Sequence, residues 1–212
     1  MIRPVAAAAA AATLALSASA LPAAAQDVAL SFGVAVTTDY ISRGLSQTGG
    51  RPAIQPYAQV DVAGFYAGIW ASNVRFPGDN DRVEVDLYAG FANTVGALSY
   101  DVGYARYFYN RSGDCCGEFL LGLEMEAPYG ATFSTDVAYD HRFDIWTGSL
   151  GAGYAFATGL GVSAEVGRQQ RSHNFWNIGL GMALDQTTSF DLRVHDTDIT
   201  SARLVGSVFF DF

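Results

Sequence analysis

Hydrophobic and polar residues alternate along most of the chain, and the alternation is strictest in its last segment, Ala202–Phe212. Leu204, Gly206, Val208, Phe210 and Phe212 share one face there, whereas Arg203, Val205, Ser207, Phe209 and Asp211 share the other. A period of two is typical of a β-strand whose two faces lie in different environments. We therefore expect this segment to be a strand with one continuous apolar face.

The same periodicity predicts about twelve strands. The connections between them carry Gly, Pro, Asp and Asn, which favour turns. Odd-numbered connections are the longer and more polar ones, and even-numbered connections are short. The expected strands are 28–40, 53–62, 65–73, 82–93, 98–109, 118–127, 131–139, 145–156, 160–167, 174–184, 189–195 and 202–212.

This arrangement favours one architecture. Strands of about 9 to 13 residues that alternate short turns with longer loops are typical of outer-membrane barrels. We predict an all-β fold, an antiparallel transmembrane β-barrel of about twelve strands. The C-terminal strand, which ends at Phe212, is expected to close the barrel by pairing with Val28–Tyr40, because an open sheet edge in lipid leaves backbone groups without partners.

The beginning of the chain has a different pattern. Arg3 precedes an apolar, alanine-rich run, and Ala23-Ala24-Ala25 supplies the small-residue pattern that signal peptidase cuts. We predict that residues 1–25 are a secretory signal peptide and that residues 26–212 form the outer-membrane barrel. The rest of the sequence has no apolar run near the ~20 residues that a membrane helix needs. The expected location is the outer membrane of a Gram-negative cell.

Composition adds to this prediction and excludes one class of function. With 23 Gly, 13% aromatic and 16% charged residues, the chain suits strands and turns better than a soluble sandwich with a solvated outer face. The formal net charge is −9, and all 12 basic residues are arginine. An acidic chain with no basic stretch is not expected to bind nucleic acid.

The two cysteines, Cys115 and Cys116, are adjacent in an expected loop, 110–117. They lack the spacing of a zinc site or a thioredoxin-like motif. In an oxidising compartment three states are open: a vicinal disulfide, a bond between chains, and two free thiols.

Several segments resemble a known family. Asp39-Tyr40-Ile41-Ser42-Arg43-Gly44-Leu45-Ser46-Gln47-Thr48, followed by Pro52-Ala53, is similar to the N-terminal signature of the TorF family of putative porins. The segments 64–73, 84–90 and 196–198 are also similar to that family. The motif residues are Asp39, Tyr40, Arg43, Gly44, Gln47 and Pro52. The resemblance implies an outer-membrane porin-like barrel, brings no catalytic or ligand residues, and does not account for the cysteine pair.

The polar face of each expected strand is assigned to the lumen. The predicted pore-lining residues are Asp61, Glu84, Asp86, Asp101, Glu124, Glu126, Asp136, Glu165, Asp191, Arg193, Arg203 and Asp211. Because unpaired charges are costly to bury, this excess of carboxylates favours a hydrated interior. Loop arginines such as Arg43, Arg51, Arg75 or Arg82 are candidates to fold inward and reduce the imbalance.

Uncharged residues on the same face set the expected width of the lumen. Tyr57, Tyr88 and Tyr107 are expected to narrow the bore. Seven inward glycines are expected to keep the wall thin: Gly90, Gly103, Gly122, Gly151, Gly153, Gly179 and Gly181.

We predict a narrow passive channel for small hydrophilic solutes or ions, with a preference for cations because rings of Asp and Glu attract them. The main alternative is a non-conducting barrel with a structural or ligand-binding role, because the interiors of small barrels can be filled by side chains. No catalytic residue, metal site or cofactor is predicted.

Two weaker alternatives involve specific residues. A lipid hydrolase needs an oriented nucleophile and base. Of His141, His173 and His195, the last lies near Asp191, Asp198 and Ser201 at an expected rim, but no nucleophile elbow is present. Asp79-Asn80-Asp81 and Asp196-Thr197-Asp198 are rich enough in oxygen for Ca²⁺, although turn formation accounts for them equally well.

The expected partners are outer-membrane lipids and lipopolysaccharide, small hydrophilic solutes, and the barrel-assembly machinery. That machinery is expected to recognise the C-terminal strand that ends at Phe212. Arg142, Arg168 and Arg171, at the expected outer rim, are candidates for bidentate contacts with lipopolysaccharide phosphates.

Overall fold

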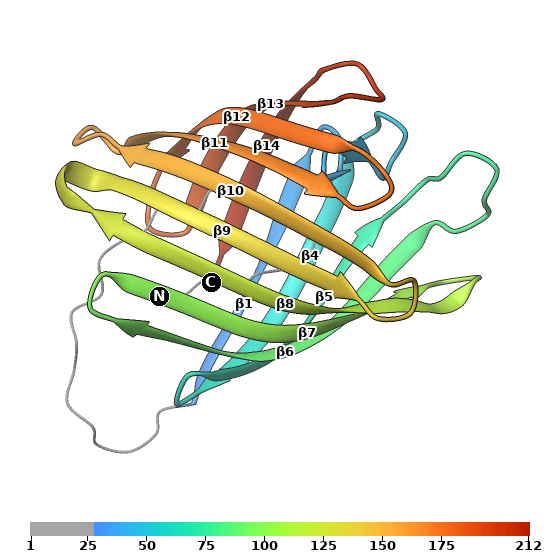
Figure 1. Cartoon of the computed structure of the whole chain (residues 1–212), viewed down its shortest axis with the longest axis horizontal. Helices are drawn as coiled ribbons and strands as arrows, with labels where there is room; N and C mark the ends of the chain where they lie inside the picture. The colour runs from blue at the N-terminus through green and yellow to red at the C-terminus, as the bar shows by residue number, and fades with distance from the viewer. Residues whose placement is uncertain (1–27) are drawn as a thin grey trace.

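The computed structural model describes residues 28–212, which form a closed antiparallel barrel (Figure 1). Around the barrel, β1 is followed by β14 and then by each preceding strand down to β4, which pairs with β1 again. The twelve barrel strands of this part of the chain are β1 (Ala29–Thr37), β4 (Ala53–Val62), β5 (Phe65–Asn73), β6 (Val83–Val95), β7 (Leu98–Tyr109), β8 (Gly113–Ala127), β9 (Ala131–Asp140), β10 (Ile145–Ala155), β11 (Leu160–Gln169), β12 (Asn174–Ala183), β13 (Thr188–Thr197) and β14 (Arg203–Asp211). The predicted fold class is confirmed, whereas the predicted signal peptide lies outside the described residues.

The seam between β1 and β14 closes the barrel as the alternation predicts. Gly33 lies opposite Asp211 and Thr37 opposite Ser207 in an antiparallel register. The backbone amide of Phe212 donates to the carbonyl of Phe32 at 2.8 Å, and the two aromatic rings stack with centroids 5.7 Å apart. Closure leaves no strand edge of the barrel without a partner, which is what a lipid environment requires.

The two faces of the wall differ as the period-two pattern predicts. Leu30, Leu150 and Leu204 point outward and are 63–65% exposed. Their neighbours on the inner face are polar or small, and many of them are buried, as Gln59 and Ser149 are. Apolar residues therefore cover the outside of the barrel, and its hydrogen-bonding groups face inward.

The long and the short connections between strands lie at opposite ends of the barrel. The longer loops gather at one end of the barrel, on the right and at the top of Figure 1, and the short turns lie at the other end. One short turn, between β8 and β9, is the 3₁₀ segment η1 (Pro128–Gly130). Among residues 28–212, no helix is long and apolar enough to cross a membrane.

Three details differ from the sequence-based expectation or settle it. Alternation alone leaves the facing of Tyr66 and Trp70 open, because Phe65 and Ile69 are apolar too; in the structure Tyr66 and Trp70 point inward and are buried. Strand β8 begins at Gly113, so the cysteine pair lies in a strand and not in a loop. The first outer loop, expected to be irregular, contains a two-stranded hairpin of β2 (Ile41–Ser42) and β3 (Leu45–Ser46).

Candidate functional site

The candidate site is built around the first outer loop, residues 38–52, which we call loop L1. Its hairpin turns at Arg43 and Gly44, which both have positive φ (50° and 80°). Two consecutive residues of this kind form the tight turn that suits a two-residue β-hairpin, and glycine adopts it without strain. The Asp39 carboxylate accepts hydrogen bonds from the hydroxyls of Ser46 (2.6 Å) and Thr48 (2.7 Å), which fixes the base of the loop.

Loop L1 folds into the mouth of the barrel and contacts opposite sides of it. The Arg43 guanidinium bonds Glu118 on β8 at 2.7 Å. The carbonyl oxygen of Arg43 accepts a hydrogen bond from Nε2 of His173, in the loop before β12, at 2.7 Å. Gly44 lies against Phe175 on β12 and Thr197 on β13. Because its base is anchored beside β1 and β4, L1 crosses the lumen.

An aromatic layer lies beneath L1, on the inner face of β4–β8. Tyr40 of L1 is 2% exposed and packs edge-on against Trp70, with ring centroids 5.4 Å apart. The buried residues of this cluster are Tyr40, Ala53, Tyr66, Trp70, Val74, Tyr88, Ala92, Ala105 and Tyr107. We call this side of the barrel the aromatic wall.

Three carboxylates are embedded in the aromatic wall, and we call Glu84, Asp86 and Glu118 the acidic cluster. Glu118 accepts hydrogen bonds from Arg43 and from the Tyr107 hydroxyl, each at 2.7 Å, and Glu84 accepts one from Tyr109 at 2.9 Å. Asp86 is 2% exposed, and its Oδ1, like Oε2 of Glu84, has no hydrogen-bond partner in residues 28–212. One arginine thus faces three carboxylates, which makes this side of the constriction strongly acidic.

Glycines of the aromatic wall are covered by rings. A side chain at Gly90 or Gly103 would collide with the Tyr66 ring, and one at Gly68 would collide with Tyr88. The hydroxyl ends of Tyr66 and Tyr88 therefore occupy the space above these glycines. The expectation that Gly90 and Gly103 keep the wall thin is wrong, because an aromatic ring takes the space that each glycine leaves.

The inner face of β9–β14 is different, and we call it the small-residue wall. On β9–β12 its inward positions are mostly Gly, Ser, Thr and Ala, such as Ser149, Gly151 and Ser163, whereas β13 and β14 also carry larger inward residues. The large side chain Arg193 lies over Gly179 and bonds Asp191 (3.0 Å), Asn177 (2.5 Å) and Ser163 (2.8 Å). The structure therefore leaves more lumen on this side than beneath L1.

Carboxylates also line the small-residue wall and its borders. Glu165 accepts a hydrogen bond from Asn177 at 2.7 Å, whereas Asp136 and Glu124 have no hydrogen-bonding partner among the described residues. Strand register places Asp101, Gly122 and Asp136 in one row across β7, β8 and β9. Several negative charges are thus spread along the open part of the lumen.

The structure places the remaining predicted residues on the inner face, most of them in hydrogen bonds. Asp61 bonds Gln59, Asp101 bonds Tyr66, and Asp211 bonds Tyr57. Arg203 lies 3.4 Å from Asp39 of L1, so it ties the final strand to the loop. Glu126, one residue before the end of β8 at the short-turn end of the barrel, is exposed. Whether these residues line a conducting pore stays a prediction.

The sequence motif Asp39, Tyr40, Arg43, Gly44, Gln47 and Pro52 maps onto L1 and its attachment. Gln47 bridges two segments through its backbone. Its backbone amide donates to the Tyr40 carbonyl, and its backbone carbonyl accepts from the Arg75 amide, both at 2.7 Å. The Pro52 carbonyl accepts a hydrogen bond from Asn73 at 3.0 Å. Of the four loop arginines considered, Arg43 is the one that reaches the acidic cluster; Arg51, Arg75 and Arg82 are exposed.

Sequence reasoning missed two inward carboxylates, Glu118 and Asp140, both less than 9% exposed. Glu118 has the same strand parity as Glu124 and Glu126, so extending that alternation three steps back from Glu124 would have found it. The alternation predicts a loop at Asp140, but this residue ends β9 and accepts hydrogen bonds from the amides of Arg142 and Phe143 in the next loop. No sequence signal pointed to the contact between Arg43 and Glu118.

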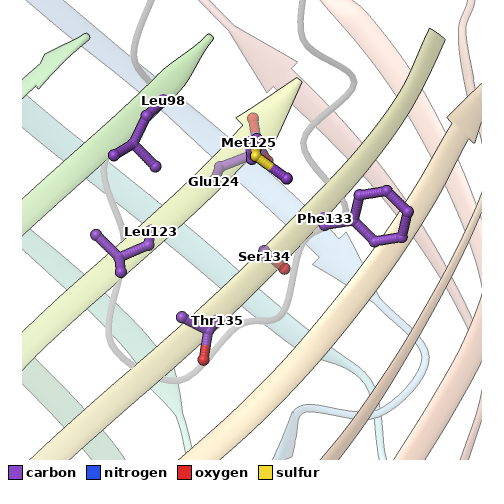
Figure 2. Close-up of a pocket in the computed structure, with 7 residues that line it drawn as sticks. All are labelled: Leu98, Leu123, Glu124, Met125, Phe133, Ser134 and Thr135. Carbon is purple, nitrogen blue, oxygen red and sulfur yellow. The ribbon is translucent and has the colours of Figure 1, made fainter. Parts of the chain in front are cut away.

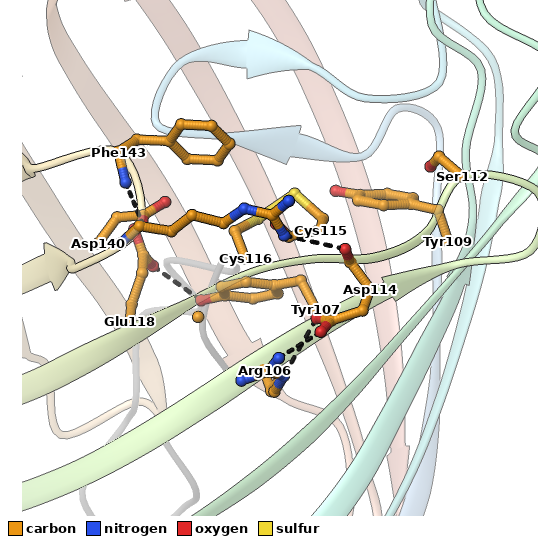
Figure 3. The surroundings of a disulfide bond; sticks show 12 residues. Arg106, Tyr107, Tyr109, Ser112, Asp114, Cys115, Cys116, Glu118, Asp140 and Phe143 are labelled. Carbon is orange, nitrogen blue, oxygen red and sulfur yellow. Dashed lines mark hydrogen bonds and ion pairs between the residues drawn. A yellow bond between two sulfur atoms is a disulfide. The ribbon is translucent and has the colours of Figure 1, made fainter.

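Cys115 and Cys116 form a vicinal disulfide on β8 (Figure 3). The register between β7 and β8 shifts here, since Tyr107 pairs with Cys116 while Phe108 pairs with Asp114, so the strand bulges. Arg142 donates to the carbonyl of Cys115, and Arg106 forms an ion pair with Asp114. The disulfide packs on the aromatic wall two residues before Glu118, beside the contact that holds L1.

The histidines do not form a hydrolytic arrangement. His195 lies near the loop end of β13, opposite Arg203, and it is buried on the inner face of the strand. His141 bonds the Gly117 carbonyl, and His173 bonds Ser172 and L1. Within residues 28–212, no histidine is hydrogen-bonded to a carboxylate, and no group of three or more His, Cys, Asp or Glu is arranged to hold a metal ion.

The acidic loop segments are joined to neighbouring loops by hydrogen bonds. The Ser112 hydroxyl donates to Asp81 at 2.6 Å and the Arg111 amide at 2.7 Å, and these bonds hold the pKa of Asp81 below its usual value. Asp198 accepts from the backbone and side-chain amides of Asn174, which likewise lower its pKa. Both carboxylates therefore serve loop structure.

A closed twelve-stranded barrel with an inward-folded outer loop has the architecture of outer-membrane β-barrels. The chain belongs to the family described as "Bacterial protein of unknown function (Gcw_chp)", whose model matches residues 22–209. No curated protein matches the sequence.

Solved structures share this fold at low identity. The chain is similar to the KdgM porin (TM-score 0.67, 11% identity, covering 86% of this chain and 99% of that one). It is also similar to the KdgM porin in complex with disordered oligogalacturonate (TM-score 0.65, 10% identity, 86% and 98% covered). A third is the COG4313 outer membrane channel from Pseudomonas putida F1 (TM-score 0.50, 9% identity, 100% of both chains). At these identities the likeness establishes the fold alone.

Proposed function

We propose that this protein is a porin-like channel of the outer membrane that passes small hydrophilic solutes or ions and prefers cations. The observation that carries the proposal is L1, which narrows the mouth from the side of the aromatic wall and leaves the acid-lined small-residue wall as the path. A loop folded into a barrel lumen and a ring of carboxylates are physical means of selecting solutes by size and charge.

The charge distribution supports the preference for cations. Twelve carboxylates lie on the inner face of the described strands, namely Asp61, Glu84, Asp86, Asp101, Glu118, Glu124, Glu126, Asp136, Asp140, Glu165, Asp191 and Asp211. Arg43 and Arg193 form ion pairs with Glu118 and Asp191, and Arg203 pairs with Asp39. The remaining negative charge attracts cations and repels anions along the lumen.

The likeness to the KdgM porin supports a channel but not the same solute. One of its structures contains oligogalacturonate, an acidic saccharide. The acidic lumen of the present barrel would repel such a chain, so a neutral or cationic solute fits its charge better.

Location and partners belong to the same proposal. The exposed apolar outer face and the closed seam suit the outer membrane, with lipids and lipopolysaccharide around the barrel. The barrel-assembly machinery would recognise the C-terminal strand, which ends at Phe212. The more specific membership in the TorF family of putative porins rests on the L1 motif and stays a prediction.

Planar-bilayer recordings of the purified barrel test the channel. Wild-type protein is expected to give small conductance steps and a cation-selective reversal potential. Replacing the hairpin, residues 41–46, with two glycines should raise the conductance several-fold because it removes the obstruction. A heat-modifiable gel shift serves as the folding control. Absence of conductance in both proteins would favour the non-conducting alternative, and anion selectivity would contradict the proposed charge preference.

A further inference from the structure

The outer face of the barrel carries two grooves. The smaller one, about 210 Å³, lies near the turn end of β7–β9 (Figure 2). Leu98, Met125 and Phe133 form one side of it, and Leu123 and Thr135 form the other. The outward-pointing side chains of two adjacent rows make its walls, and the backbone of the inward row between them makes its floor.

The larger groove has the same construction and about 840 Å³ of volume. Its two walls are the outward rows Thr135–Leu150–Val166–Trp176–Asp196 and Val137–Gly148–Arg168–Asn174–Asp198, which run across β9–β13. The groove crosses five strands, or four spacings of 4.7–4.9 Å, so it is about 19 Å long. This length and its open side suit an extended hydrocarbon chain.

The chemistry of the larger groove changes along its length. Its part along Val137, Leu150 and Val166 is apolar, and Leu150 and Val166 there are 63% and 58% exposed. Gly148 opens it further, because a side chain at this position would meet only the Asp136 carbonyl, at 3.9 Å. Trp176 lies between this part and the polar end, as expected of a ring at a membrane interface.

The polar end lies toward the loop end of the barrel and carries a cation. Arg168 is exposed, and its guanidinium makes a single 3.4 Å hydrogen bond, to Asn174, among the described residues. Asp198 is already held by Asn174, and Asp196 accepts from the Thr197 amide. The Arg168 guanidinium therefore has N–H groups available to bind a phosphate. The neighbouring carboxylates of Asp196 and Asp198 can bind the divalent cations that accompany phosphate groups.

We propose that this groove binds one acyl chain of lipopolysaccharide and that Arg168 holds a phosphate of the same molecule. The inference rests on the proposed outer-membrane location, because the polar end then faces the outer leaflet. The acyl chain lies along Leu150, Val166 and Gly148, and the sugar-phosphate head lies beside Trp176 and Arg168.

Binding of rough lipopolysaccharide to the delipidated, folded barrel in detergent tests the site, with native mass spectrometry as the readout. Gly148→Leu fills the apolar part and Arg168→Gln removes the phosphate contact; each is expected to weaken binding at least tenfold. The matched control is Gly206→Leu, another outward glycine, whose side chain would meet only Leu192 at 3.9 Å. The control should bind as the wild type does.

Each other result overturns the assignment. If Gly148→Leu binds lipopolysaccharide as the wild type does, the acyl chain does not lie in this groove. If Arg168→Gln does so, Arg168 does not hold the phosphate. Phosphatidylglycerol that binds as tightly as lipopolysaccharide would show a non-selective lipid surface. If Gly148→Leu fails to give a heat-modifiable barrel, Leu150→Ser replaces it. Conductance of the same preparations is measured separately, so loss of the channel function and loss of the lipid site are distinguishable.

Discussion

The aromatic wall and the small-residue wall are both built from antiparallel β-strands, but they have different structural roles. The aromatic wall buries Tyr40 of L1 against Trp70 and sets Tyr66 and Tyr88 on glycines. The small-residue wall leaves its inward positions small and concentrates its large polar contacts on Arg193. One wall supports the loop, and the other borders the space that the loop leaves.

The difference shows that the same residue type has opposite consequences on the two walls. Gly90 makes room for a ring, whereas a side chain at the inward Gly151 would meet the Ser134 hydroxyl, which can rotate, and no other atom closer than 3.7 Å. Asp86 is buried beneath L1, whereas Asp136 is exposed to the lumen. Substitutions matched between the walls therefore test the comparison directly.

The largest stability effect is expected at the glycines beneath the rings. In Gly90→Ala the new methyl group would lie 2.6 Å from the Val102 carbonyl and would also collide with Tyr66. Such overpacking should lower the free energy of unfolding by about 3 kcal/mol. Urea unfolding in lipid vesicles measures it, with Gly151→Ala on the small-residue wall as the control that should change little, because the Ser134 hydroxyl can rotate away. Equal losses in both variants would remove the distinction between the walls.

A somewhat smaller effect is expected at the contact that holds L1. Arg43→Ala leaves Glu118 buried with the Tyr107 hydroxyl as its remaining partner, which should cost about 2 kcal/mol of unfolding free energy. Glu118→Gln should cost less, since a neutral amide needs no counter-charge. The double variant measures the coupling: losses that simply add would mean that the two side chains do not stabilise each other.

Ion selectivity should depend on the open wall only. A unit charge about 5 Å from a passing ion in water contributes about 0.8 kcal/mol, or roughly a fourfold change in permeability ratio. Asp136→Asn should therefore reduce the cation preference by up to this factor, as read from the reversal potential in a salt gradient. Asp86→Asn, beneath L1, should leave it nearly unchanged. The reverse ranking would place the ion path along the aromatic wall.

The smallest effect concerns pH and the loops above the aromatic wall. Because the pKa of Asp81 is lowered in the folded barrel, its hydrogen bonds stabilise the loops above the unfolded-state pKa near 4. That stabilisation is lost as the pH falls through the lower, folded-state pKa. Hydrogen exchange of the Arg111 and Ser112 amides should rise at acid pH in the wild type. In the Asp81→Asn variant the exchange of these two amides should be fast and should not depend on protonation of residue 81. If this variant shows the same pH dependence as the wild type, another group causes the effect.

The amino-acid sequence by itself determined the barrel. Side chains alternate with a period of two on every strand, so the strand count, the facing of Glu84, Asp86 and Asp101, and the closing pair of β1 and β14 could all be predicted locally. The alternation failed where the local period breaks, at the bulge of Cys115 and Cys116. It also left Tyr66 and Trp70 ambiguous, because their neighbours Phe65 and Ile69 are apolar too.

Only the tertiary structure decided the site. Arg43 and Glu118 are 75 residues apart, and Arg43 and His173 are 130 apart, so no local pattern joins them. The inward fold of L1 depends on surfaces that other strands build, such as the ring of Trp70 on β5 and the carboxylate of Glu118 on β8. A strand's facing follows from its own residues, whereas a loop's position follows from what the closed barrel places across the lumen.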